Sequence, residues 1–431
     1  MAVKKIGNII SGQFPAVDYS LVDLFSGCGG LSLGFMWDEL FHPDETSPVL
    51  QMPTLVAKSP FRSILANDFN PRALESYQVN FDPDGMHSVP GSIEELIASE
   101  ARLPTTADVV MGGPPCQGFS LLNKKRAGDV RRELWWHFLE VAERVSAKVV
   151  VMENVPQLLG SQEFQLIWSR LKELGYRYRV AHVLCAANYG VPQVRNRAII
   201  LASREAPIAL PLPTHLSPRR KAVLKATEFA NLPVWRTVSE AFKGLGRPVG
   251  VDVRGDVSPA EMLHFGRRPT DESRKRYRAV PPGGNRFDLL RNAPDITPAC
   301  WVRKKSGGTD LFGRLWRDRP SVTIRTEFFK PEKGRYLHPT ADRPITHREA
   351  ARLQSFPDRF SFRGSKVEIA RQIGNAVPPL LAFAIADSVL KSLRGSTTEL
   401  DMTRMRDLFR FQLGERVDAI AVDDSSEKVA V

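Results

Sequence analysis

The sequence predicts an α/β protein in which a doubly wound, mostly parallel sheet carries a smaller, irregular domain. Three observations lead to this prediction. Short runs rich in Val, Ile and Leu alternate with helical stretches through the first two hundred residues, a pattern typical of a parallel sheet covered on both faces. After residue 203, Pro, Gly and Arg become frequent and the periodicity weakens. Nearly all of the excess positive charge also lies in this second part.

Apolar runs predict the strands, and a spacing of three and four between apolar residues predicts the helices. The predicted strands are 20–25, 62–68, 107–111, 148–154 and 197–203. The predicted helices between them include 71–81 and 132–145. Helical periodicity returns after "ITHREAARLQSFP", and the last helix, 376–393, is expected to pack back on the first domain.

The chain is long enough for two lobes, since single cores stop growing beyond about 250 to 300 residues. We expect a first domain at 1–203, a small domain with a hinge at 204–365, a returning helix at 366–394 and a tail at 395–431. Within the small domain, the segment "RRPTDESRKRYRAVPPGGNRFD" is predicted to form loops on a basic surface. The tail is predicted to be frayed or disordered.

The charge distribution indicates a polyanionic partner. The chain has a net charge of +12, and residues 204–320 carry 23 Lys and Arg against 12 Asp and Glu, a local charge of +11. Clustered cations are typical of nucleic-acid binding, because neutralising phosphates releases counterions; a plain solvated basic face is the alternative. The sequence shows no long apolar stretch and no signal peptide, so we expect a cytoplasmic protein without membrane contact.

The four cysteines are far apart and lack the spacing of a zinc site. Neither a metal nor a disulfide is expected, and Cys28, Cys185 and Cys300 are predicted to be small buried apolar residues. Cys116 differs because it lies in "GGPPCQGFS", directly after the apolar run "ADVVM". Such a turn places a side chain at the carboxyl edge of a sheet, where open α/β folds bind ligands. Cys116 is therefore a candidate nucleophile.

The stretch "VDLFSGCGGLSLGF" predicts a strand, a glycine-rich turn and a helix. Gly27, Gly29 and Gly30 would let the backbone approach a ligand, and the helix start offers free N–H groups. The spacing is G-x-G-G, and Asp68, at the end of the second strand, lies well beyond the 20 or so residues of a dinucleotide fingerprint. A nucleoside cofactor other than NAD fits better, with Asp68 accepting hydrogen bonds from ribose hydroxyls.

Six blocks stand in a fixed order along the chain: "DLFSGCGG", "GGPPCQGFS", "VVMENV", "YGVPQVRNRAII", "REAARLQSFPD" and "RQIGNAVPP". In these blocks the chain closely resembles the DNA cytosine-5 methyltransferases of bacterial restriction–modification or phage defence. The resemblance does not extend to the first twenty residues, an apparent insertion near 38–60, the basic segment or the tail.

The resemblance implies a Rossmann-like methyltransferase domain joined to a target-recognition domain. It implies that S-adenosylmethionine is the methyl donor, leaving S-adenosylhomocysteine, and that no metal is used. Double-stranded DNA is the expected partner, and a cognate restriction or defence system is another. The enzyme would act as a monomer and would flip its cytosine out of the duplex, because carbon 6 cannot be reached inside the stack.

The resemblance also assigns catalytic roles that the chemistry requires. Carbon 5 of cytosine is too weak a nucleophile to accept a methyl group until something adds to carbon 6. Cys116 would supply the attacking thiolate, and Glu153 would donate a proton towards nitrogen 3. Arg197 would face the cytosine oxygen while Arg195 holds the same pocket; either could instead be a plain surface arginine.

For the cofactor, the resemblance implies that Phe25 stacks on adenine, although Phe25 could equally be a core residue. Asp68 and Phe69 would flank the ribose and adenine, and Asn375 would close the pocket. Ser92 stands where the family commonly has Asp, so the adenine would be read through a hydroxyl or the backbone. The remaining cofactor candidates are Gly27, Gly29, Gly30, Leu31 and Pro114.

DNA contacts are expected near the nucleophile and on the basic domain, where "PPGGN" and "SGG" would be loops of close approach. The candidates are Gln117, Ser120, Arg274, Lys275, Arg276, Arg303, Lys304 and Lys305. Two other functions are weighed against DNA methylation. A tRNA cytosine-5 methyltransferase of the same superfamily would have a smaller recognition region. A catalytically silent DNA-binding regulator would not need Cys116, Glu153 and Arg197 intact.

Overall fold

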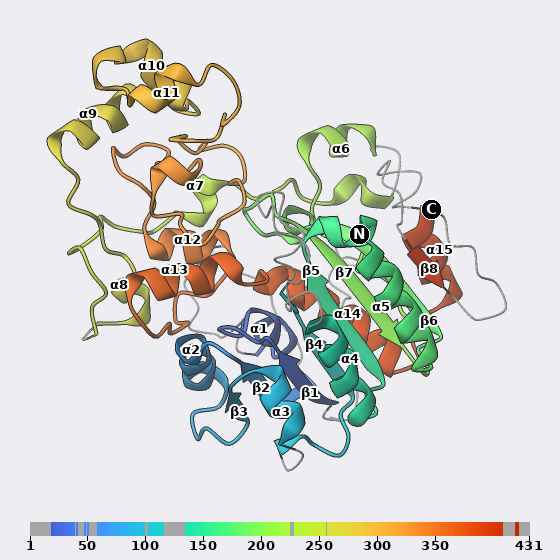
Figure 1. Cartoon of the computed structure of the whole chain (residues 1–431). Helices are drawn as coiled ribbons and strands as arrows, with labels where there is room; N and C mark the ends of the chain where they lie inside the picture. The colour runs from blue at the N-terminus through green and yellow to red at the C-terminus, as the bar shows by residue number, and fades with distance from the viewer. Residues whose placement is uncertain are drawn as a thin grey trace.

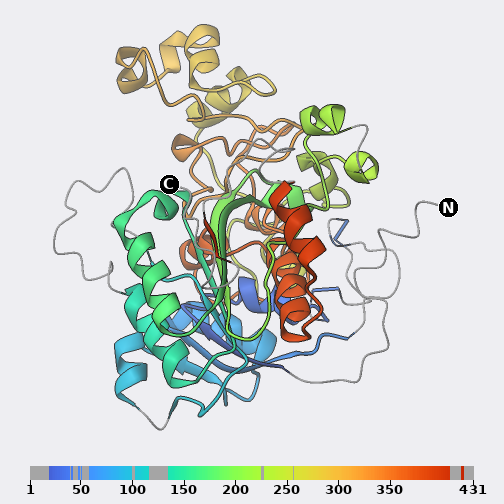
Figure 2. The same cartoon turned by 90° about the vertical axis from the view of Figure 1, so that its right-hand side faces the viewer.

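The structure is a computed structural model that describes residues 19–38, 40–41, 47–48, 50, 58–99, 102–115, 134–224, 228–255, 257–407 and 419–421. Within these residues, an eight-stranded sheet forms the centre of the larger lobe. Helices cover both faces of the sheet, and a smaller lobe stands at its edge (Figures 1 and 2).

The strand order is β3-β2-β1-β4-β5-β7-β6-β8. The strands are β1 (Tyr19–Leu24), β2 (Phe61–Asp68), β3 (Ser88–Pro90), β4 (Val109–Gly112), β5 (Val149–Asn154), β6 (Tyr178–Cys185), β7 (Asn196–Ser203) and β8 (Ala419–Ala421). Strands β1 to β5 pair in parallel, whereas β7 is antiparallel to both of its neighbours and β8 is antiparallel to β6. The prediction of a doubly wound, mostly parallel sheet is confirmed.

The order reverses between β1 and β4, because the chain first winds outward from β1 through β2 to β3 and then returns to β4. At such a reversal the turns after the two strands diverge and leave a crevice at the carboxyl edge. Two of the blocks that stand out in the sequence follow these strands: the glycine-rich turn after β1 and the "GGPPC" turn after β4.

The helices of the larger lobe are α1 (Gly30–Phe35), α2 (Pro71–Phe81), α3 (Ile93–Ala98), α4 (Leu134–Arg144), α5 (Gln162–Glu173), α14 (Pro379–Leu393) and α15 (Glu399–Asp407). Local sequence explains where they start. Asn70, for example, accepts hydrogen bonds from the N–H groups of Arg72 and Ala73, and Pro71 fills the first turn of α2.

Strand β5 shows why the apolar runs are continuous. Val149 and Val151 belong to one core with α1 and α14. Val150 and Met152 face the other way and belong to a second core with α3, α4 and α5. Alternate residues of a strand point to opposite faces, so a strand covered on both faces must be apolar at every position. Helix α14 packs against α1 and thereby joins the end of the chain to its beginning.

The smaller lobe contains α7 (Val238–Ala241), α8 (Pro259–Met262), α9 (Asp271–Ala279), α10 (Arg286–Asn292), α11 (Ala299–Arg303), α12 (His347–Leu353) and α13 (Lys366–Asn375), whereas α6 (Pro218–Val223) lies beside the larger lobe (Figure 1). Helices α9, α10 and α11 lie at its far end, away from the sheet (Figure 1). Tyr277, Val280, Leu289 and Phe312 give that end a small core of its own. Nearer the sheet, Leu263 and other apolar residues join the large core.

The prediction of loops between residues 267 and 288 is wrong, because α9 and the start of α10 lie there. Thr270 caps α9 by accepting from the N–H of Ser273, and two acidic residues lie in its first turn. Tyr277 is its single buried residue. A short helix anchored by one buried side chain shows no apolar periodicity. Its many charged residues therefore read as a loop in the sequence.

Within the tail, the described residues 395–407 and 419–421 include regular structure that was not predicted. They contain α15 and β8, and Met402 and Met405 are buried in the large core. The N–H of Leu210 donates to the sulfur of Met405 at 3.0 Å. Two apolar side chains four or fewer residues apart are enough to anchor a short helix. Cys28 is buried as expected, but Cys185 is only partly buried and Cys300 is exposed, so the prediction of buried residues is wrong for these two.

Among the described residues, no single helix is long and apolar enough to cross a membrane. The bent pair α13 and α14 satisfies length and composition only when its two helices are taken together.

Candidate active site

The turn after β1 forms one wall of the crevice. Phe25 adopts φ 56°, a left-handed conformation that is costly for a bulky residue. Gly27 also has a positive φ, and a Cβ added there would meet nothing within 4 Å. The backbone at Gly27 therefore faces open space, where a ligand could approach closely.

Gly29 and Gly30 are required for a different reason from the one the sequence suggested. A Cβ on Gly29 would lie 2.3 Å from a ring carbon of Phe81, and a Cβ on Gly30 would lie 2.4 Å from the carbonyl oxygen of Val377. The absence of a side chain at these glycines lets α1 pack closely against Phe81 and Val377. The side chain of Leu31 is buried in the large core, so only its backbone could contact a cofactor.

Asp68 ends β2 and ties the glycine-rich turn in place. One carboxylate oxygen accepts from the N–H of Gly27 at 2.8 Å and the other from the N–H of Asn70 at 2.8 Å. Burial raises the pKa of Asp68, and the two hydrogen bonds oppose that effect. Each oxygen retains a lone pair for a further donor. Phe69, the next residue, is 68% exposed. An aromatic ring this exposed offers a flat apolar surface on which a ligand could stack.

Ser92 serves as a helix cap. Its hydroxyl accepts from the N–H of Glu95 at 3.2 Å, and the N–H of Ser92 donates to the Glu95 carboxylate at 2.8 Å. This reciprocal pair is a capping box, recognisable in the sequence as S-x-x-E. Because the hydroxyl accepts the helix N–H, its own proton remains available for an acceptor.

Asp23, in β1, is a buried acid that the sequence analysis missed. It is fully buried, Oδ2 accepts from the Ser32 hydroxyl at 2.7 Å, and Oδ1 has no partner among the described residues. Burial raises its pKa from 3.8 to about 7, against the effect of the Ser32 hydrogen bond. The strand position "VDLF" contains a polar residue inside an apolar run, which is the signal that could have identified it.

We expect Asp23→Asn to stabilise the protein at pH 8 but not at pH 4. The folded pKa of about 7 exceeds the ordinary 3.8, so the folded state binds the proton more tightly and loses stability as the pH rises from about 4 to 7. A difference of about three units between the folded and unfolded pKa values corresponds to up to about 4 kcal/mol in the free energy of unfolding. Thermal melts from pH 4 to 8 measure this effect.

Asp108 provides a matched control with the opposite sign. Burial raises its pKa, but hydrogen bonds from Ser20 and Lys148 outweigh burial and lower the pKa overall. Asp108→Asn should therefore destabilise the protein at pH 8. If the melting temperature of Asp23→Asn followed that of the wild type at every pH, ionisation of the buried Asp23 would not destabilise the fold, and the prediction would be wrong.

The turn after β4 packs against the end of β5. A Cβ on Gly113 would lie 2.9 Å from Oε2 of Glu153, and the Asn154 amide donates to the Pro114 carbonyl oxygen at 3.0 Å. Pro114 and Pro115 are the last described residues before Cys116. Cys116, Gln117 and Ser120 lie outside the described residues.

Glu153 and Arg197 form an ion pair at the same edge. Nε of Arg197 lies 2.7 Å from Oε1 of Glu153, with 16% and 11% of the two side chains exposed. Arg197 is the second residue of β7, which pairs with β5. The structure thus brings together two of the predicted catalytic residues from separate blocks of the sequence.

Arg195 is buried, so the interpretation of it as a surface arginine is wrong. It is 1% exposed, and burial lowers its pKa well below the usual value. Its guanidinium donates to the carbonyl oxygens of Ile324 at 3.1 Å, Gly374 at 3.0 Å and Ala376 at 3.0 Å. Arg195 therefore joins the start of β7 to the "IGNAVPP" turn and positions this wall of the site. Asn375, in the same turn, is exposed.

Gln193 is a second positioning residue, and the sequence analysis missed it. It is fully buried, its amide donates to the Leu353 carbonyl and the Gln354 side chain, and its oxygen accepts from the N–H of Ile324. The signal in the sequence is a glutamine in each of the blocks "VPQVRNR" and "LQSFP".

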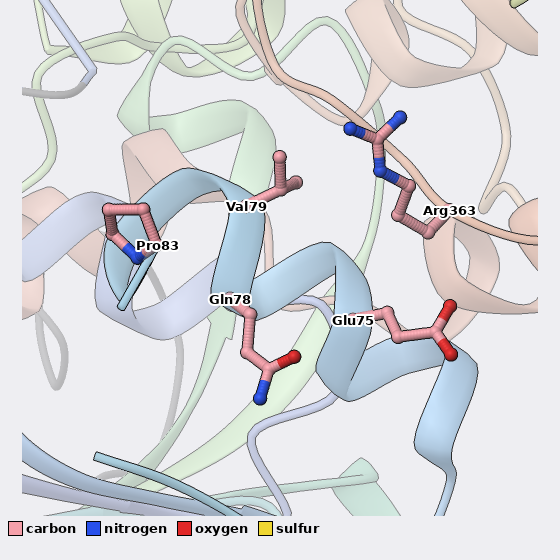
Figure 3. Close-up of a pocket in the computed structure, with 5 residues that line it drawn as sticks. All are labelled: Glu75, Gln78, Val79, Pro83 and Arg363. Atoms are coloured by element: carbon pink, nitrogen blue, oxygen red, sulfur yellow. The ribbon is translucent and has the colours of Figure 1, made fainter. Parts of the chain in front are cut away.

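Two cavities border the described structure. One, of about 450 Å³, lies between the smaller lobe and the start of β7, and Val194, Gly308, Arg325 and Tyr336 are among its lining residues. Arg325 is exposed and makes no ion pair among the described residues. The other, of about 320 Å³, lies on the outer side of α2 beside Arg363 (Figure 3). Its Glu75, Gln78, Val79 and Pro83 all come from α2 or its end, and it is not part of the crevice.

The predicted DNA-binding cations lie on the smaller lobe. On α9, Arg274 pairs with Asp271 at 3.1 Å and Arg276 pairs with Glu272, while Lys275 is exposed. Arg303, Lys304 and Lys305 are exposed at the end of α11 and just after it. Both groups lie at the end of the lobe far from the sheet (Figure 1).

Comparison with known proteins agrees with this geometry. The family model for C-5 cytosine-specific DNA methylase matches residues 19–391. The chain is 31% identical over 381 residues to Type II methyltransferase M1.HphI of Haemophilus parahaemolyticus, covering 86% of each chain. It is 31% identical over 409 residues to Type II methyltransferase M.NgoFVII of Neisseria gonorrhoeae, covering 93% of this chain and 94% of the relative.

Solved structures show the same fold. A prophage-encoded E. coli protein described as a DNA modification methyltransferase aligns with a TM-score of 0.58 at 22% identity, covering 88% of this chain and 100% of that one. The Dnmt2 methyltransferase of S. pombe aligns with a TM-score of 0.50 at 16% identity, covering 86% and 98%. By the family model and these curated relatives, the chain belongs to the C-5 cytosine-specific DNA methylases and is an S-adenosylmethionine-dependent DNA cytosine-5 methyltransferase.

Proposed function

We propose that this enzyme methylates a flipped cytosine through Cys116, Glu153 and Arg197. The observation that supports this most directly is the ion pair of Glu153 with Arg197 beneath the turn that leads to Cys116. The Cys116 thiolate adds to carbon 6, and negative charge then builds towards nitrogen 3. Glu153 donates a proton there, while Arg197 holds the carboxyl group with Nε and faces the cytosine oxygen. Once carbon 5 carries the methyl group, it loses its proton, the bond between carbon 6 and the Cys116 sulfur breaks, and the thiolate is released. Arg195 and Gln193 position this wall without touching the base.

The residues of the crevice fit S-adenosylmethionine. The exposed ring of Phe69 offers a stacking surface, the open backbone at Gly27 admits close approach, and Asp68 keeps lone pairs for ribose hydroxyls. The Ser92 hydroxyl and the exposed Asn375 complete the proposed pocket, and Pro114 and Phe25 line it. When bound, S-adenosylmethionine supplies the methyl group that carbon 5 accepts. No metal is part of the proposal.

We further propose a role in a Type II restriction–modification system, in line with the names of the curated relatives. The target would lie in duplex DNA, and residues 204–365 would form the recognition domain. A cognate nuclease would be the functional partner. The enzyme would act as a monomer in the cytoplasm, where that DNA is found.

Methyl transfer to duplex DNA and to tRNA, with S-adenosylmethionine labelled on its methyl group, tests this proposal. We expect label in duplex DNA, and methylation-sensitive sequencing of DNA from expressing cells would give the site. Label in tRNA alone would contradict the proposal, and binding without transfer would favour the regulator.

The contribution of α9 to DNA binding gives a separate prediction. Arg274→Ala, Lys275→Ala and Arg276→Ala together should weaken binding to all duplexes alike and flatten the salt dependence, by up to about 0.9 per lost phosphate contact. S-adenosylmethionine affinity should stay unchanged, because the proposed pocket lies in the other lobe. Arg144→Ala, on α4, is the matched control. An unchanged salt slope would mean that these side chains form only a solvated face.

A further inference from the structure

Residues 303–310, here named the 303–310 loop, curl around one buried side chain. Arg286, at the start of α10, is 1% exposed. Its guanidinium donates to five carbonyl oxygens: Trp301 at 3.2 Å, Lys304 at 2.9 Å, Ser306 at 3.3 Å, Gly307 at 2.7 Å and Gly308 at 3.3 Å. The planar fork of arginine has five N–H donors. One side chain therefore fixes the shape of a loop that has no regular secondary structure beyond the end of α11.

The inward carbonyls determine where the N–H groups point. In a planar trans peptide, the carbonyl and the N–H of the next residue point in opposite directions, and the described chain has no cis peptide. The N–H groups of Lys305, Gly307, Gly308 and Thr309 thus point away from Arg286. None of them donates to another described residue. Gly307 and Gly308 have φ 70° and 62°, which only glycine adopts readily.

The side chains of the loop add positive charge to these free donors. Arg303, Lys304 and Lys305 are exposed and make no ion pair among the residues that the structure describes. The arginines of α9, in contrast, are paired with acids of their own helix. Free N–H groups on the outer side of the loop, beside unpaired cations, are donors that suit an anion.

The end of the loop, unlike Arg303, Lys304 and Lys305, reaches toward the start of β7. Gly308, at its end, lines the 450 Å³ cavity together with Val194 and the unpaired Arg325. Val194 is adjacent to Arg195 and three residues before Arg197. The end of the loop therefore shares a cavity with the segment that leads to Arg195 and Arg197.

We propose that the 303–310 loop binds a phosphate of the DNA backbone and that Arg286 is the positioning residue that gives the loop its shape. The inference rests on the proposed function, because duplex DNA is the source of the phosphate. Main-chain N–H groups and long cations recognise a phosphate rather than a particular base. The loop should thus contribute affinity and not sequence preference.

DNA binding by the full chain with S-adenosylhomocysteine, measured over a range of salt concentrations, tests this inference. Arg286→Met should weaken binding to any duplex by about tenfold, the loss of one or two charge-assisted hydrogen bonds, and lower the salt slope. S-adenosylmethionine affinity should stay unchanged. Arg291→Met is the matched control on the same helix, since Arg291 is exposed and pairs only with Asp288 among the described residues.

Lys304→Ala with Lys305→Ala tests the same loop without touching buried residues, so it remains informative if Arg286→Met fails to fold. We expect a salt slope lower by up to about 0.9 for each lost contact, and little further loss when Arg286→Met is added. An unchanged slope, or relaxed site preference at an unchanged slope, would overturn the inference. Binding needs no turnover, so a wild type that binds DNA but methylates only tRNA would contradict the proposed function and not the loop.

Discussion

Cys116→Ala is expected to reduce methyl transfer to background while DNA and S-adenosylmethionine still bind. The substitution removes the sulfur that adds to carbon 6 and changes little volume, so the barrier rises without loss of the fold. A labelled-methyl assay on duplex DNA measures the loss, and binding assays show that both ligands are retained. Cys300→Ala is the matched control, because Cys300 is exposed on the smaller lobe.

A covalent trap checks the same role in the unmodified enzyme. Duplex DNA with 5-fluorocytosine at the target should form an adduct that survives a denaturing gel, since fluorine cannot leave carbon 5 as a proton does. The adduct should be absent with Cys116→Ala and present with Cys300→Ala. Turnover by Cys116→Ala, or a trapped adduct with it, would assign the nucleophile to another residue.

Sequence patterns predicted the sheet well where strands are buried on both faces. All five predicted strands are present, with ends within two residues of the prediction, because apolar residues dominate these runs. Strand β6 was missed because Arg179 and His182 interrupt its apolar pattern, although both are buried. Arg179 remains buried by lying over the Trp168 ring, 5.4 Å from its centroid. Strands β3 and β8 have three residues each, too few for any periodicity to show.

The sequence predicts which residues carry the chemistry of the site, but not which contacts hold them in place. Glu153 and Arg197 stand in recognisable blocks, and pairing of β5 with β7 brings them together. The partners of Arg195 are carbonyl oxygens 129 to 181 residues away in the chain. Any residue has a carbonyl, so no sequence pattern identifies such partners. The same holds for Arg286, whose side-chain hydrogen bonds among the described residues all go to main-chain carbonyls.

Buried arginines hold the loops of the smaller lobe together through hydrogen bonds to main-chain carbonyls. Arg314 donates to the carbonyl oxygens of Val280, His338, Ala341 and Tyr277, and Arg335 does the same for other loops of the lobe. Such buried guanidiniums donate to carbonyl oxygens in loops and at the end of a helix, outside the strands of the sheet. Part of the positive charge that the sequence analysis assigned to DNA therefore holds loops together, and the exposed cations of α9 and of the 303–310 loop remain for phosphates.

Glu153→Gln is expected to lower the turnover rate by about 10²-fold or more, the usual scale of lost general-acid help. The amide oxygen can still accept from Nε of Arg197, as Oε1 of Glu153 does at 2.7 Å. The fold, the start of β7 and cofactor binding should therefore be preserved. What is lost is the proton for nitrogen 3, so the rate of the chemical step should fall while the affinities for both ligands stay near wild type.

Single-turnover kinetics on duplex DNA measures that step directly, since product release does not contribute. Glu143→Gln is the matched control: Glu143 also pairs with an arginine, Arg170, at 2.6 Å, but on the outer surface of α4. It should turn over as the wild type does. A wild-type rate for Glu153→Gln would reject the proton-donor role. A lower rate accompanied by weaker cofactor binding would mean instead that Glu153 supports the pocket through Arg197.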